Sequence, residues 1–238
     1  MSEVADGLVL RGWAVDPAAG REGPALVAVR DGILERVTWL EGADADGVSP
    51  DGLLILPGLV DLHAHFREPG NEDAETVATG LAAAAHGGFT TVCLMPNTTP
   101  TIDEPSVVAR VRAAADASGS PVRVLVHGAV TSGRKGETLA AMGELADAGV
   151  VGFSDDGAPV HAAPIMRNAL AYAGALGLPV IEDAAHAVVT QYRGKPAGGI
   201  GDVGIFSFDA VKNLAVGEGG AIAARDPEAL IRARQLRY

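Results

Sequence analysis

The stretch Asp61-Leu-His-Ala-His-Phe-Arg-Glu-Pro-Gly70 follows an apolar run from Leu53 to Val60. We interpret that run as one buried β-strand that ends in a pair of histidines. Because side chains alternate along a strand, His63 and His65 project to the same face and can hold one metal ion together. Imidazole nitrogen is a good zinc ligand, so a zinc hydrolase is the first hypothesis.

Composition limits the classes of protein to which the chain can belong. Its 238 residues are 48% hydrophobic and include 31 glycines, which suits a compact α/β protein. The net charge of −12 argues against a nucleic-acid partner. Cys93 is the single cysteine, so no internal disulfide forms and a cytoplasmic setting is expected. Residues 1–6 lack the features of a secretory signal, and no apolar run reaches membrane-spanning length.

The order of the predicted elements indicates the fold class. Residues 7–15 and 25–37 alternate between apolar and polar side chains, which predicts a small β-structure within residues 1–56. From residue 53 onward, strand-like and helix-like runs alternate, which predicts an α/β fold with a parallel sheet, an incomplete TIM-barrel-like (β/α) domain. The predicted strands are 53–60, 90–95, 122–126, 150–153 and 179–181. The predicted helices are 73–86, 105–117, 138–148, 165–176 and 226–237.

Polar side chains follow each of the first four predicted strands, where the active sites of β/α barrels gather. Arg67 lies two residues after His65 and can hold a substrate carboxylate with both arms of its guanidinium. Asn97 can add an amide contact. Asp156 offers a carboxylate that can bridge two metal ions. We interpret Asp155 as a turn residue, and we place the other histidines, without chemistry, on a helix surface, at a strand end and in a loop: His86, His127 and His161.

Four motifs resemble those of the dihydroorotases, in the amidohydrolase branch where an aspartate replaces the usual carboxylated lysine. They lie at residues 57–70, 87–91, 95–98 and 153–157, and the likeness covers about residues 7–178. The resemblance implies one or two zinc ions held by His63, His65 and Asp156. It also implies that Arg67 and Asn97 bind the α-carboxylate of dihydroorotate, whose ring opens to N-carbamoyl-L-aspartate in pyrimidine biosynthesis.

The pattern changes after Leu178. A dihydroorotase would continue with two more histidines and a late aspartate, and the first of those histidines falls on Asp183. Segments at residues 179–186, 192–195, 201–208, 212–214 and 217–221 instead resemble the sugar aminotransferases that use pyridoxal phosphate. That resemblance implies a Schiff base on Lys212, a pyridinium partner in Asp183 and a phosphate contact from Ser207. His186 would lie near the cofactor ring.

Our hypothesis is therefore a chimera of three parts, residues 1–56, 57–178 and 179–238. The first expected function is a dihydroorotase-like zinc hydrolase of a cyclic amide, impaired because the back half of its site is missing. The alternatives are a pyridoxal-phosphate-dependent aminotransferase fragment and an inactive scaffold. The last strand of an incomplete barrel has no partner to close the sheet and leaves an edge open, so we also expect self-association into a homo-oligomer.

Overall fold

The computed structural model describes residues 7–217 and 219–236. Two compact units make up this part of the chain, residues 7–59 with 232–236, and residues 60–231. The expectations about residues 1–6, Glu218 and Arg237 lie outside the described residues, and the three-part division made from the sequence stays a prediction. Within the described ranges, no helix has the length and apolar character that a membrane crossing requires.

The first unit contains a four-stranded sheet in the order β3-β2-β1-β4. Strands β1 (Gly7–Asp16), β2 (Arg21–Arg30) and β3 (Ile33–Trp39) are antiparallel, and β4 (Leu54–Ile55) runs parallel to β1. A short 3-10 helix, η1 (Gly42–Ala45), lies between β3 and β4. The small hydrophobic core of this sheet is formed by Ala14, Ala25 and Val27. The small β-structure expected from the alternating N-terminal pattern is thus present.

The apolar run 53–60 is not one buried strand, and this prediction was wrong. Its first part, β4, joins the N-terminal sheet, while β5 (Leu59–Ala64) starts the sheet of the second unit. The break falls at Pro57-Gly58, because proline has no backbone N–H to donate to a ladder and glycine weakens a strand. Leu53, Leu54 and Leu56 are exposed.

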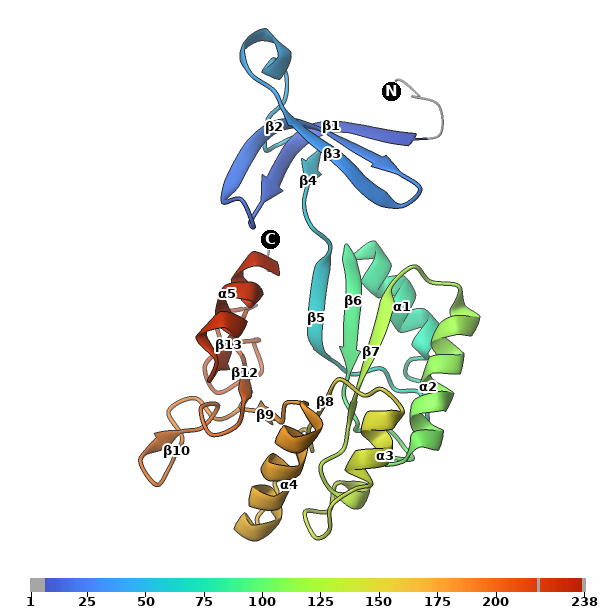
Figure 1. Cartoon of the computed structure of the whole chain (residues 1–238), viewed down its shortest axis with the longest axis vertical. Helices are drawn as coiled ribbons and strands as arrows, with labels where there is room; N and C mark the ends of the chain where they lie inside the picture. Colours follow the sequence, from blue (N-terminus) through green and yellow to red (C-terminus); the bar gives the residue numbers. More distant parts are fainter. Residues whose placement is uncertain (1–6, 218, 237–238) are drawn as a thin grey trace. The chain divides into compact units, whose positions relative to one another are not determined.

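The second unit is built on a sheet in the order β5-β6-β7-β8, with β6 (Phe89–Leu94), β7 (Arg123–Gly128) and β8 (Gly152–Phe153) (Figure 1). Strands β6, β7 and β8 are parallel. Helices α1 (Val77–His86) and α2 (Pro105–Ser118) pack on the sheet, and α3 (Met142–Asp147) and α4 (Ala163–Leu176) pack on each other. This arrangement is the predicted parallel half-barrel.

Two helices begin later than the sequence predicted. Helix α1 starts at Val77 rather than at residue 73, because Thr76 and Thr79 form a capping box at its N-terminus. Helix α3 starts at Met142 rather than at residue 138, because Leu139 forms a β-bridge with Thr131. The loop before α3 is thereby tied to the short 3-10 helix η2 (Ser132–Arg134), which follows β7.

The segment after residue 178 forms a sheet in the order β13-β12-β9, with β9 (Ile181–Asp183), β12 (Val203–Ser207) and β13 (Gly220–Ala224). Strands β9 and β12 are parallel. A small hairpin, β10 (Gln191–Tyr192) and β11 (Lys195–Pro196), separates them, and α5 (Pro227–Leu236) follows β13. Val180 forms a parallel bridge with Phe153 of β8, so β9 continues directly from the edge of the half-barrel.

Candidate metal centre

His63 and His65 lie at the carboxyl end of β5, the first strand of the half-barrel. Strand alternation brings their rings together with centroids 4.8 Å apart, edge to face. The backbone N–H of His63 donates to Asp61 Oδ1 at 2.9 Å, which fixes the end of the strand. The predicted histidine pair is therefore present as a single cluster.

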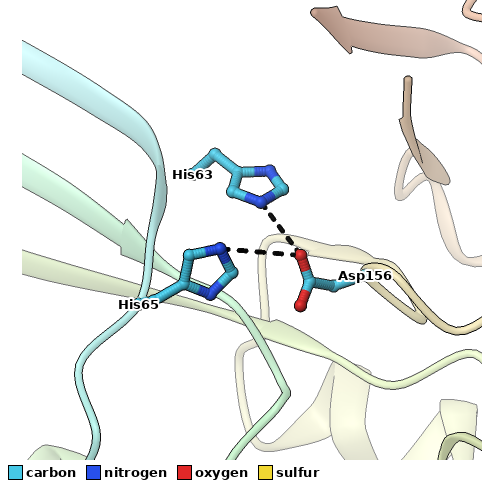
Figure 2. A group of neighbouring side chains, drawn as sticks. All are labelled: His63, His65 and Asp156. Carbon is cyan, nitrogen blue, oxygen red and sulfur yellow. Dashed lines mark ion pairs between the residues drawn. The ribbon is translucent and has the colours of Figure 1, made fainter. Parts of the chain in front are cut away.

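Asp156 approaches this pair from the loop after β8. Its Oδ1 lies 2.9 Å from His63 Nε2 and 3.7 Å from His65 Nε2, as Figure 2 shows. Tetrahedral zinc with bonds near 2.0–2.1 Å separates its ligand atoms by about 3.3 Å, and the two distances bracket that value. In residues 7–217 and 219–236, these three side chains form the one cluster of metal-ligating type. They can hold a metal ion.

The electrostatics of the cluster favour an ionised Asp156. Burial by itself raises the pKa of this carboxyl group, but the hydrogen bond with His63 and the charges of His65, His63 and Arg134 outweigh it. The resulting pKa lies below the usual value for an aspartate. A carboxylate is the form that ligates a metal ion.

Asn97 contacts the pair from the segment after β6. Its Oδ1 lies 3.1 Å from His65 Nδ1. An amide oxygen can only accept, so this contact suits the His65 tautomer that has its proton on Nδ1 and presents Nε2 to a metal ion. Sequence analysis assigned Asn97 to substrate and missed this contact. The substrate role stays a prediction, as does that of Arg67, whose side chain is exposed.

Asp155 is the first residue of a turn, since the Ala158 N–H donates to its carbonyl. Its side chain, however, is 6% exposed and does more than the sequence indicated. The carboxylate accepts from the backbone N–H groups of Val130 and Thr131 at 2.9 and 3.0 Å, and from Thr131 Oγ1. Asp155 therefore fastens the loop after β8 to the loop after β7.

The other histidines lie where the sequence placed them. His86 is exposed on α1 with Nδ1 2.7 Å from the carbonyl of Ala82, and His161 is exposed in a loop. His127 is the second-to-last residue of β7 and is buried, and its Nδ1 has no hydrogen-bond partner among the described residues. Burial lowers the pKa of His127 to about 4, so this ring is neutral at pH 7.

Arg134 is the charged neighbour of the cluster that sequence analysis missed. Its Nε donates to the carbonyl of Asp155 at 2.8 Å, and its Nη2 donates to the carbonyl of Asp156. The same Nη2 lies 3.8 Å from Asp156 Oδ2. Its position in a turn of η2, 22 residues before Asp156 in the chain, gave no periodic signal.

The four residues of the aminotransferase-like pattern lie at the carboxyl ends of two neighbouring parallel strands or in the segments that follow them. Asp183 ends β9 and Ser207 ends β12. Lys212 Nζ lies 3.4 Å from His186 Nε2. Asp183 Oδ1 accepts from the backbone of Ala185, and Ser207 Oγ accepts from that of Asp209.

A parallel half-barrel that carries a histidine pair and an aspartate at the carboxyl ends of its strands defines a β/α-barrel protein with a candidate metal centre. The family model described as "Dihydro-orotase-like" matches residues 52–193, more than half of the chain, so the chain belongs to that family. A second model, for the DegT/DnrJ/EryC1/StrS aminotransferase family, matches residues 160–238. The prediction that regions of these two families follow each other is confirmed.

Individual relatives agree with the first match. The chain is 46% identical over 175 residues to a dihydroorotase of Pelotomaculum thermopropionicum, covering 73% of this chain and 40% of the relative. It is 48% identical over 171 residues to a dihydroorotase of Desulforapulum autotrophicum, covering 70% and 40%. The chain thus spans about 40% of the length of these relatives.

Among solved structures, the L-hydantoinase (dihydropyrimidinase) of Arthrobacter aurescens is similar, with a TM-score of 0.50 at 20% identity. The similarity covers 71% of this chain and 38% of the hydantoinase. At this identity it supports the fold alone.

Proposed function

We propose that residues 57–178 form the front part of a zinc-dependent cyclic amidohydrolase whose substrate is dihydroorotate. The observation that carries this proposal is the convergence of His63 Nε2, His65 Nε2 and Asp156 Oδ1 at the carboxyl ends of parallel strands. Membership of the dihydroorotase-like family supports the substrate. The single, buried Cys93 supports a cytoplasmic setting.

Each residue of the site has a proposed task. His63, His65 and Asp156 hold the zinc ion, and Asn97 orients His65 through its ring nitrogen. When bound, zinc polarises an amide carbonyl and lowers the pKa of a water molecule so that hydroxide is available near pH 7. The Arg67 guanidinium and the Asn97 amide N–H groups bind the carboxylate of the substrate.

We further propose that hydrolysis by this chain is weak. Three protein ligands suffice for a catalytic zinc ion, but the residues after Leu178 follow the aminotransferase pattern, and Asp183 stands where the dihydroorotase resemblance implies a further histidine. Metal binding is therefore expected to be stronger than catalysis. These three ligands can hold one zinc ion. A second zinc ion would require ligands from elsewhere.

Zinc per chain, measured by elemental mass spectrometry on protein purified without chelator, tests the metal site. We expect bound zinc in the parent protein and its loss in His63→Ala and Asp156→Asn. His161→Ala is the matched control, because this histidine is exposed in a loop. Equal zinc contents in all four proteins, or none in the parent, would contradict the site. Ring opening of dihydroorotate, followed in both directions, then tests the substrate.

A separate observation supports the aminotransferase alternative. Lys212, which follows β12, lies close to His186, which follows β9. Lys212 would attach pyridoxal phosphate and Asp183 would pair with its ring nitrogen, which lets the cofactor act as an electron sink. Added cofactor would then give a new absorption band that Lys212→Ala removes and Lys195→Ala keeps. A protein that binds neither zinc nor pyridoxal phosphate would favour a scaffold.

A further inference from the structure

One partly buried cation beside the proposed metal site, Arg134, has no task in the proposed reaction. Arg134 is 19% exposed, and its guanidinium contacts two consecutive residues of the loop after β8. It donates to the carbonyls of Asp155 and Asp156, and its Nη2 also approaches Asp156 Oδ2 at 3.8 Å. One planar group therefore holds both the backbone and the side chain of a proposed metal ligand.

These contacts divide the two oxygens of Asp156 between different neighbours. Both imidazoles approach Oδ1, and Figure 2 shows the two interactions meeting at that one atom. The other carboxylate oxygen, Oδ2, is the one that pairs with Arg134 Nη2. A metal ion held by the histidines would therefore meet Oδ1, while Oδ2 stays with the guanidinium.

The loop that carries Arg134 is itself fixed. Asp103 Oδ2 accepts from the Gly133 N–H at 2.7 Å and from Ser132 Oγ at 3.3 Å. Arg134 and Asp156 both have positive φ, 57° and 33°, a conformation that residues other than glycine adopt only where their surroundings impose it. The two residues that contact each other are thus both held in unusual backbone conformations.

We propose that Arg134 is a positioning residue for the metal site, which turns Asp156 so that Oδ1 alone faces His63 and His65. The inference rests on the proposed function, because it takes these three side chains as zinc ligands. It extends that function to a residue outside the group of proposed metal ligands. Outer residues of this kind typically change metal affinity by about 10–100-fold.

The test compares the zinc affinity of the full chain, by competition with a chromophoric chelator, in the parent, Arg134→Met and Arg112→Met. Arg112 is the matched control, since its guanidinium also donates to two consecutive carbonyls, those of Ala148 and Gly149. We expect about 10–100-fold weaker zinc binding in Arg134→Met and unchanged binding in Arg112→Met. Cobalt(II) provides a second measurement, because its visible band changes when a carboxylate changes from one-oxygen to two-oxygen ligation.

Parent-like affinity and an unchanged cobalt band in Arg134→Met would overturn the inference and leave the proposed metal site intact. An equal loss in Arg112→Met would also overturn it, because the effect would then come from general destabilisation. A parent that binds no zinc would overturn the metal site and the inference together. The dihydroorotate assay reports separately on the substrate.

Discussion

Asp155 and Asp156 are neighbours of the same type, yet their carboxylates have different partners. Asp155 accepts three hydrogen bonds from Val130 and Thr131, whereas Asp156 meets His63 and His65. The loop after β7 supplies the partners of the first and β5 those of the second. Asp155 therefore has a structural role, whereas its neighbour Asp156 has the proposed role of a metal ligand.

We predict that Asp155→Asn destabilises the metal-free protein by about 2–3 kcal/mol, because an amide cannot replace a carboxylate that accepts three hydrogen bonds in a buried site. Asp156→Asn should lose zinc while losing less stability. Urea unfolding in the presence of a chelator, with zinc content measured beside it, checks both variants. Zinc that is retained in Asp156→Asn and lost in Asp155→Asn would transfer the ligand role to Asp155.

His127 predicts a pH dependence of stability. Its pKa is about 4 in the folded protein and near 6.5 in the unfolded chain, so the unfolded chain binds more protons between these values. The contribution of the neutral ring is fully present above pH 6.5 and is lost as the pH falls toward 4. Between pH 7.5 and pH 5 the loss should reach about 2 kcal/mol.

The measurement is the free energy of unfolding at both pH values for the metal-free parent and for His127→Gln. Glutamine does not titrate, so the difference between the two proteins isolates His127 from the other groups. A difference that stays constant from pH 7.5 to pH 5 would mean that His127 is already charged or accessible in the folded protein.

At the scale of residues, the site was partly predictable. The histidine pair follows from strand alternation, which is a local rule. The contacts of Asn97 with His65 and of Arg134 with Asp156 join residues 32 and 22 positions apart. They depend on how strands and loops meet in space, and no spacing rule within one element predicts them.

At the scale of the elements, helix α1 depends on the cap at its N-terminus and on the side chain against which it packs. Thr76 and Thr79 cap it, and Gly80 faces the buried ring of Phe66. A Cβ added at Gly80 would come within 2.5 Å of that ring. Since Phe66 directly follows His65, the packing of this helix bears on the position of a proposed ligand.

We predict that Gly80→Ala lowers stability by about 1–2 kcal/mol, because overpacking outweighs the gain of about 1 kcal/mol in helix propensity. Gly174→Ala in α4 is the matched control. It is exposed, an added Cβ meets nothing within 4 Å, and the variant should gain about 0.5–1 kcal/mol. Thermal unfolding of both variants checks this prediction. Higher stability in both variants would show that the Phe66 ring can move aside without destabilising the protein.

The elements themselves were largely predicted by periodicity, and the errors have local causes. The run 53–60 was assigned to one strand because apolar pattern alone does not show which sheet receives each part. Proline and glycine at 57 and 58 mark the actual division. The early starts assigned to α1 and α3 ignored capping and bridge contacts, which compete with helix formation.

At the scale of the whole molecule, we retain the proposal of self-association but place it at β5, because the Phe153–Val180 bridge continues the sheet at β8, where the sequence predicted the open edge. In the part of the chain that the structure describes, β5 is an outer strand of the half-barrel sheet, and Leu62 on it is 37% exposed. We expect a dimer or larger species by light scattering after gel filtration, reduced in Leu62→Lys because edge charges oppose strand pairing. Val189→Lys is the control, since Val189 is 95% exposed outside any strand. A monodisperse monomer would refute the proposal.

The passage of the chain from β8 to β9 has a consequence for cooperativity. Val180 bridges to Phe153 while the next residues pair with β12, so backbone pairing joins β8 of the half-barrel to the sheet formed after residue 178. Zinc bound at β5 should slow amide hydrogen exchange in β12 as well as in β6 and β7, because local opening is shared within a cooperative unit. Protection confined to β6 and β7 would instead reveal two independently unfolding segments.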